Sequence, residues 1–366
     1  MGRLFQLCFL LLVPLTVVSG QETTSPQLKP RPTAPVEVSP HPAPSAANRR
    51  ITLEVQVTDK FGAPVRGLQT RDFTLLDDKL PLNILSFHAV DHSAPASSDP
   101  PVEIVLVVDA VNAPFQAVSY ERNEIRKFLL QNGGKLAQPV SLLIFADAGS
   151  KMQADASSDG NALAALYDQY ETGLRSINRS QGFYGATERF DMSLKTIRSL
   201  AAYEATRPGR KLMIWISPGW PLLSGPNIEL TGKEEQQFFD SIVSLSNELR
   251  KAGVTLYNID PLGLADFGIR TSYYEEFLKG VASPRHAQGA DLGLQVLATQ
   301  SGGRVLNTNN DITAAIASCA ADADAFYVLS FEAPPADHAH EYHSLAITVD
   351  KPGVTARTRT GYYARP

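Results

Sequence analysis

One aspartate closes an apolar run at a position where functional residues gather in α/β proteins. Residues 103–113 read Glu-Ile-Val-Leu-Val-Val-Asp-Ala-Val-Asn-Ala, and the apolar part ends at Asp109. Such a run predicts a parallel strand that is buried on both faces. In an open α/β sheet, ligands bind beyond the carboxyl ends of the strands. Asp109 and the nearby Asn112 are therefore the first candidates for a binding site.

The residues around Asp109 resemble the metal-ion-dependent adhesion site of von Willebrand factor A domains. In that family the pattern is Asp-x-Ser-x-Ser, in which both hydroxyls bind the metal, and a Thr and a second Asp arrive from later loops. This chain keeps Asp109 but has Val111 and Ala113 where the serines belong. The resemblance implies that Thr187 corresponds to the Thr, whereas Pro218 stands where the second Asp belongs.

The resemblance therefore implies a degenerate metal site. Mg²⁺ prefers oxygen ligands in near-octahedral geometry, and the two apolar replacements remove two of them. We expect no cofactor and a role in which Asp109 caps backbone amides or holds the Asn112 loop. The alternative is that Mg²⁺ or Mn²⁺ is held by Asp109 and Thr187, helped by Asn112, Asp147 or Asp260, and clamps an acidic group of a partner.

A second group of residues that could bind a metal lies near the C-terminus. Residues 337–343 read Asp-His-Ala-His-Glu-Tyr-His, so His338, His340 and His343 fall within seven residues. Imidazole and carboxylate groups are ligands of zinc and copper. However, alternate residues of a hairpin point to opposite faces, and Pro334-Pro335 just before the stretch favours a solvated loop. A solvated loop is the simpler interpretation.

Ser217 follows another apolar run and is followed by Pro218 and Gly219, which gives it a superficial likeness to a nucleophile. The chain has no Gly-x-Ser-x-Gly elbow, no phosphate-binding Gly loop and no His-Glu-x-x-His. We expect a turn residue and no enzymatic activity, the alternative being a hydrolase that uses Ser217 or the three histidines. Trp220 and Leu222 predict either an apolar contact surface or buried core.

Composition and the N-terminus indicate an exported protein. The net charge of −5 gives no electrostatic support for nucleic-acid binding. Residues 1–20 combine Arg3, an apolar segment and a Val-Ser-Gly end, which predicts a signal peptide and a periplasmic or extracellular location. No later stretch is long and apolar enough to span a membrane. Cys319 alone remains after the signal, so we expect a buried thiol and no internal disulfide.

The rest of the chain divides into a linker, a β module and an α/β domain. Residues 21–49 are rich in proline and predict an extended tether. Residues 50–92 begin with strict apolar alternation and predict an N-terminal β module, too short to be complete. Residues 340–366 alternate again, so we expect these C-terminal strands to pair with that module and form an antiparallel β-sandwich.

Residues 101–332 alternate strand and helix patterns, which predicts a doubly wound, mostly parallel, Rossmann-like sheet. Residues 263–288 have no clean period and predict an excursion near the carboxyl edge of the sheet. Strands are expected in the following ranges: 103–109, 140–145, 211–216, 254–259 and 325–331.

The whole mature chain resembles the von Willebrand factor A-related proteins typical of acidobacteria. The order and spacing of several short motifs carry the resemblance, namely residues 57–68 with Asp72-Phe73, residues 107–112, 216–219, 302–304 and 327–329, His343-x-Leu345 and Gly361-Tyr362. The resemblance implies a von Willebrand factor A-like fold and an exported module of unassigned role. We expect a non-enzymatic adhesion or scaffold protein whose unknown protein partner contacts Asn112, Ser217, Trp220 and Leu222.

Overall fold

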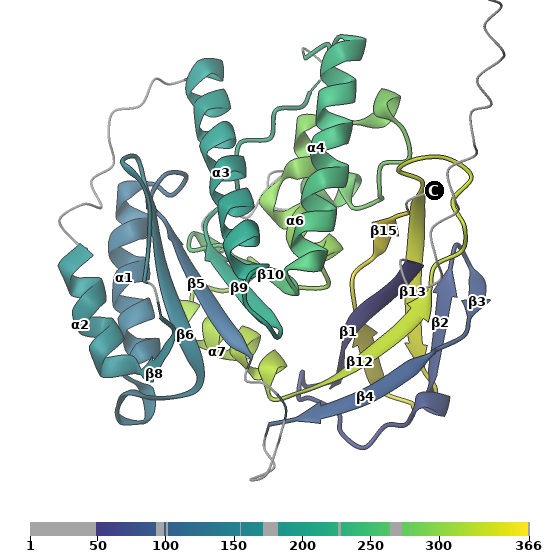
Figure 1. Ribbon diagram of the computed structural model, residues 1–366. Coiled ribbons are helices and arrows are strands. Elements are labelled where there is room, and N and C mark those ends of the chain that lie inside the picture. The colour runs from purple at the N-terminus through teal and green to yellow at the C-terminus, as the bar shows by residue number, and fades with distance from the viewer. Residues whose placement is uncertain are drawn as a thin grey trace, which may run out of the picture. The chain divides into compact units, whose positions relative to one another are not determined.

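The computed structural model describes most of the chain, and all described residues lie within one compact unit, Ala43–Pro366 (Figure 1). The predicted signal peptide and the proline-rich segment up to residue 48 lie outside the described residues. Within the described part, no helix is both long and apolar enough to cross a membrane. The described ranges are 49–92, 99, 102–153, 155–170, 182–225, 228–263 and 273–364.

A mainly parallel sheet forms the centre of the α/β region, as the buried apolar runs predict. Its strand order is β11-β10-β9-β5-β6-β7, in which β7 alone runs antiparallel to its neighbour along this path and β8 pairs separately with β6. Every residue of β5, β9 and β10 is buried. The strands are β5 Glu103–Asp109, β6 Lys135–Ala146, β7 Gly149–Met152, β8 Ser157–Asp159, β9 Lys211–Ile216, β10 Val254–Ile259 and β11 Val305–Leu306.

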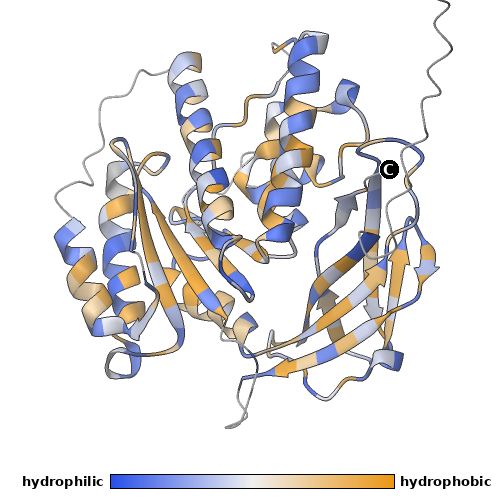
Figure 2. Cartoon of the chain, in the orientation of Figure 1, coloured by the Kyte–Doolittle hydropathy of each residue, from blue (hydrophilic) through white to orange (hydrophobic). Residues whose placement is uncertain are grey.

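Helices cover both faces of this sheet (Figure 1). Alternate residues of β5 enter different cores: Leu106 packs with α1, α2 and α7, and Val107 packs with α3, α4 and α6. Figure 2 shows orange strands and helices with blue outer faces, the distribution expected of a sheet buried between two helical layers. The helices are α1 Phe115–Leu129, α2 Gly160–Tyr170, α3 Phe183–Glu204, α4 Gly232–Lys251, α6 Leu294–Gln300 and α7 Ile312–Ala320.

Of the predicted excursion at 263–288, residue 263 and residues 273–288 are described. It contains short 3₁₀ helices at Tyr273–Phe277 and Pro284–His286. Val281 and Ala287 are buried in the core that also contains residues of α4 and α6. Cys319, in α7, is fully buried, and burial raises the pKa of its thiol to about 12, as expected for an unreactive apolar-like cysteine.

Two antiparallel sheets flank the α/β region and combine strands from both ends of the chain. The C-terminal strand β13 pairs with β2, and β14 pairs with β1. One sheet is ordered β14-β1-β12-β4 and the other β15-β13-β2-β3, and they share a core that includes Leu53, Leu75 and Tyr362. The strands are β1 Arg50–Asp59, β2 Phe73–Asp77, β3 Leu80–Leu82, β4 Ser86–Asp91, β12 Ala325–Glu332, β13 Tyr342–Val349, β14 Val354–Arg357 and β15 Gly361–Tyr363.

Strand β12 lies in a different sheet from the one that its sequence predicts. It pairs antiparallel with β1 and β4 and takes no part in the central sheet. Phe326 packs into the core around α1 and α7, whereas Leu329 and Phe331 pack into the core between the antiparallel sheets. The strand is thus apolar on both faces because it separates two cores. A parallel strand that is covered by helices on both faces has the same uniformly apolar sequence.

Candidate functional site

Asp109 is completely buried at the carboxyl end of β5, and its carboxylate accepts four hydrogen bonds from N–H groups. Oδ1 accepts from the backbone amides of Val111 at 3.0 Å and Asn112 at 2.9 Å. Oδ2 accepts from Nδ2 of Asn112 at 2.9 Å and from Nε1 of Trp215 at 2.9 Å. This is the arrangement of an aspartate that caps amides and holds the Asn112 loop.

Two effects oppose each other at the Asp109 carboxyl group. Burial raises its pKa, while hydrogen bonds from Asn112 and Trp215 favour the charged form and lower it, and burial is the larger effect. Val111 and Ala113, which stand in place of the two metal-binding serines, are 7% and 6% exposed and belong to the apolar cores. The loop after β5 therefore offers a cation no hydroxyl at these two positions.

Glu121, in α1, is a buried carboxyl group that the sequence reasoning missed. It is fully buried, and neither carboxyl oxygen has a hydrogen-bond partner among the described residues. Burial raises its pKa well above the ordinary value, and the charges of Asp109 and Asp260 raise it further. The signal was available in principle, because residue 121 falls between Val118 and Ile125 on the apolar face of the helix.

Thr187 lies one turn into α3, where its hydroxyl donates to the carbonyl of Phe183 at 3.0 Å. The link between the β5 loop and α3 is made further along the helix, because Nδ2 of Asn112 also donates to Oγ of Ser193 at 3.0 Å. Asn112 therefore connects the Asp109 carboxylate to α3, a role that Thr187 does not fill.

Ser217 and Trp220, two of the predicted partner contacts, lie inside the protein. Ser217 is 0% exposed, and its Oγ accepts a hydrogen bond from the amide of Gly219 at 3.2 Å, as in a turn. Trp220 is 4% exposed and its ring packs edge-on against Trp215 at 5.2 Å. Trp220 therefore belongs to the buried core, because its indole fills space beside a second tryptophan. Leu222 and Asn112 remain partly exposed.

The three histidines do not form one cluster. His338 and His340 are exposed, whereas His343 is buried in β13 and its Nδ1 lies 3.0 Å from Oδ1 of Asp77. The alternation of a strand separates residues that adjoin in the sequence. The alternative interpretation, a metal site built from all three histidines, therefore has no counterpart in the geometry of these side chains.

Two exposed aromatic residues begin α3. Phe183 is 59% and Tyr184 is 83% exposed, and their rings meet edge-on at 6.3 Å. Nζ of Lys211, the first residue of β9, donates to the carbonyl of Glu204 at the other end of α3. The helix therefore begins at the carboxyl end of the sheet and ends at its amino end. The aromatic pair and the Asp109 loop lie toward the same edge.

Comparisons with known proteins yield distant structural neighbours. No protein-family model matches the chain, and no curated protein matches it. The human COPII-coat protein Sec24c is similar at 8% identity and a TM-score of 0.38, over 78% of this chain and 47% of that one. The pilus adhesin SpaC from Lactobacillus rhamnosus GG is similar at 11% identity and a TM-score of 0.39, over 85% of this chain and 47% of that one.

The SpRpn10 VWA domain is similar at 12% identity and a TM-score of 0.26, over 57% of this chain and 88% of that domain. The chain spans about half of the length of Sec24c and SpaC.

Proposed function

We propose that the chain is an exported, non-enzymatic protein-binding module, of the adhesion or scaffold kind, that works without a metal ion. Its α/β region is a doubly wound, von Willebrand factor A-like domain of the acidobacterial type with a degenerate metal-ion-dependent adhesion site. The observation that carries the proposal is the Asp109 carboxylate, whose two oxygens are both engaged by N–H donors inside a fully buried site.

The strand order supports a binding site at this edge of the sheet. The next strand along the chain, β6, lies on one side of β5 in the sheet, and the later strands β9 and β10 lie on the other side. The loops after β5 and β9 therefore flank the point where the strand order reverses, the place where open α/β sheets bind ligands. Asn112 and Leu222, both partly exposed, belong to these two loops.

The donors around Asp109 support metal independence. An ion bound directly to Asp109 would displace N–H donors, among them the indole of Trp215, which is fully buried. Each buried donor left unpaired costs roughly 1–3 kcal/mol. Mg²⁺ would gain no compensating hydroxyl from Val111 or Ala113.

Phe183 and Tyr184 are the residues that best suit contact with a protein partner. Large aromatic side chains that are exposed together provide much apolar area for little loss of side-chain entropy, and tyrosine is enriched in binding hot spots. The pair stands one turn before Thr187, on the helix that Asn112 joins to the Asp109 loop. The partner would offer an apolar groove to this helix end.

Affinity capture from the periplasm and medium of the source organism tests the proposal. The bait is the mature chain, compared with a Phe183→Ser/Tyr184→Ser variant. The control is Phe61→Ser, which removes an aromatic residue as exposed as Tyr184 from the antiparallel module. We expect the parent and the control to capture equal amounts of one protein, with or without chelator. The double variant should capture at least about tenfold less of it.

Calorimetric titration of the Asp109 site completes the test. We expect Thr187→Ala to leave Mg²⁺ and Mn²⁺ titrations of the chelator-treated chain unchanged, because neither ion uses Asp109 or Thr187. Capture that requires Mg²⁺ and is lost in Thr187→Ala would instead establish metal-dependent adhesion.

A further inference from the structure

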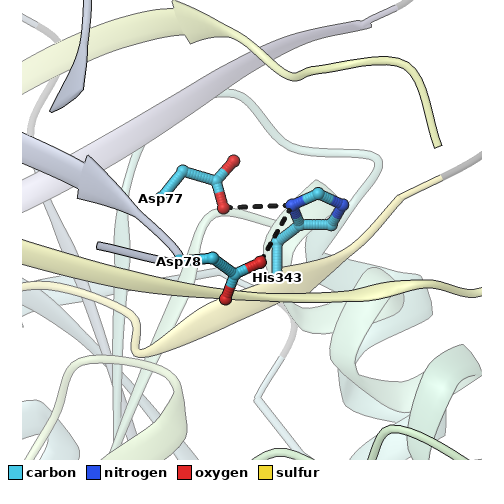
Figure 3. A group of neighbouring side chains, drawn as sticks. All are labelled: Asp77, Asp78 and His343. Atoms are coloured by element: carbon cyan, nitrogen blue, oxygen red, sulfur yellow. Dashed lines mark hydrogen bonds and ion pairs between the residues drawn. The ribbon is translucent and has the colours of Figure 1, made fainter. Parts of the chain in front are cut away.

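Two adjacent carboxylates meet an imidazole from a distant part of the chain in the antiparallel module (Figure 3). Asp77 ends β2, Asp78 opens the turn to β3, and His343 lies on β13, which pairs with β2. One ligand atom from each residue lies within 4.8 Å of the ligand atoms of the other two. Antiparallel pairing brings together groups that the sequence separates by 266 residues.

The spacing of these atoms suits a small divalent cation. Nδ1 of His343 lies 3.0 Å from Oδ1 of Asp77 and 3.5 Å from Oδ2 of Asp78. A tetrahedral Zn²⁺ ion with bonds of about 2.0–2.1 Å holds its ligand atoms about 3.3 Å apart. The two observed distances bracket that value, so small side-chain movements would admit the ion.

The other oxygen of each carboxylate is fixed by donors outside the cluster. Oδ2 of Asp77 accepts from the hydroxyl of Tyr362 at 2.6 Å. Oδ1 of Asp78 accepts from the backbone amide of Ser344 at 3.0 Å and from its hydroxyl at 2.9 Å. The Tyr362 ring also stacks on His343 at 5.0 Å, with an interplanar angle of 12°. Such outer contacts are what orient the ligands of protein metal sites.

The cluster is closed on one side and open on the other. The side chains of Asp77 and His343 are 3% and 10% exposed, whereas that of Asp78 is 53% exposed. Nδ1 of His343 is turned toward both carboxylates, and the buried Nε2 has no hydrogen-bond partner in the described part of the chain (Figure 3). An ion would enter past Asp78, and water would complete its coordination.

We propose that Asp77, Asp78 and His343 form a binding site for Zn²⁺ or a closely related first-row divalent ion. An imidazole nitrogen favours such ions over Mg²⁺ and Ca²⁺, and the two carboxylates neutralise the charge of the ion. The ion binds through the free lone pair of Nδ1 and competes with protons for it, so binding weakens as the pH falls. The site joins β13 to the β2–β3 turn and is independent of the protein-binding edge proposed above.

Calorimetric titration of the chelator-treated full chain with Zn²⁺ tests the site. We expect one saturable site in the parent protein and an affinity at least about tenfold lower in Asp78→Asn and in His343→Gln. Tyr362→Phe, which keeps the stacked ring and removes only the hydroxyl, should weaken binding about tenfold because Tyr362 positions Asp77. The matched controls are His340→Ala and Asp350→Asn, two exposed positions outside the cluster.

Thermal unfolding with and without Zn²⁺ provides the second readout. Zn²⁺ should raise the Tm of the parent and both controls more than that of Asp78→Asn. Asp78 is exposed, so this variant keeps the test valid even where His343→Gln fails to fold. The proposal is overturned by a parent that shows no saturable Zn²⁺ binding, by Asp78→Asn binding as tightly as the parent, or by His340→Ala losing the ion.

Discussion

At the scale of single residues, Glu121 is a carboxyl group whose environment opposes its charge. Its carboxyl group is fully buried without a hydrogen-bond partner in the described structure, and Asp109 and Asp260 lie close enough to add repulsion. An isolated buried carboxylate responds to such surroundings by keeping its proton. The folded protein therefore holds a proton at Glu121 in a pH range where the unfolded chain has lost it.

This difference predicts how stability changes with pH. Below the unfolded-state pKa of about 4.3 both states are protonated, and above it the unfolded chain alone loses the proton, so the free energy of unfolding falls by up to about 1.4 kcal/mol per pH unit until the folded-state pKa is reached. Glu121→Gln cannot titrate at this position, and we expect its stability relative to the parent to rise as the pH increases above the unfolded-state pKa. Urea unfolding at several pH values measures this. Parallel profiles for the two proteins would contradict it.

At the scale of elements, the contact between α6 and β10 depends on Gly303. A Cβ atom added there would lie 1.7 Å from the carbonyl oxygen of Leu256, and that atom is backbone. The loop after α6 must pass this close because it turns from the helix directly into β11, which pairs with β10. Only a residue without a side chain permits this approach.

We expect Gly303→Ala to lower the free energy of unfolding by about 3 kcal/mol, because either β10 or the loop must move. Gly232→Ala is the matched control, since a Cβ at that first position of α4 meets nothing within 4 Å and alanine favours a helix. Chemical denaturation of both variants measures the difference. A Gly303→Ala protein as stable as the control would show that the loop adapts without strain.

At the scale of the whole described unit, a buried carboxylate ties the α/β region to the antiparallel sheets. Asp322 is 2% exposed and accepts a hydrogen bond from the hydroxyl of Tyr257 in β10 at 2.7 Å. It also forms an ion pair with Arg357 in β14. Near the other face of the sheet, Phe239 in α4 meets Tyr363 in β15 edge-on at 6.2 Å. These contacts predict that both parts unfold together.

Asp322→Ala should therefore destabilise both parts at once, by about 3 kcal/mol, since it leaves Arg357 and the Tyr257 hydroxyl without their shared partner. The only two tryptophans, Trp215 and Trp220, both lie in the α/β region, so their fluorescence reports on that region while circular dichroism reports on the whole. We expect the two signals to shift together. Separate transitions in the variant or in the parent would show two independent folding units.

Local patterns in the sequence were enough to predict much of the fold. The apolar runs that end at Asp109, Ile216 and Ile259 are the buried strands β5, β9 and β10, because a strand covered on both faces has to be apolar throughout. The alternation of residues 51–57 likewise matches the buried side chains Ile51, Leu53, Val55 and Val57 of β1. Burial imposes these patterns residue by residue, so the sequence records them directly.

Such local patterns did not predict contacts between distant segments. Whether Trp220 was surface or core, and which sheet β12 joins, depended on the neighbours that the fold supplies, Trp215 in one case and β1 in the other. The meeting of His343 with Asp77 follows from antiparallel pairing across 266 residues. By itself the sequence determined which residues are buried in each strand; the tertiary structure decided which strands and side chains meet, because pairing partners leave no mark on local periodicity.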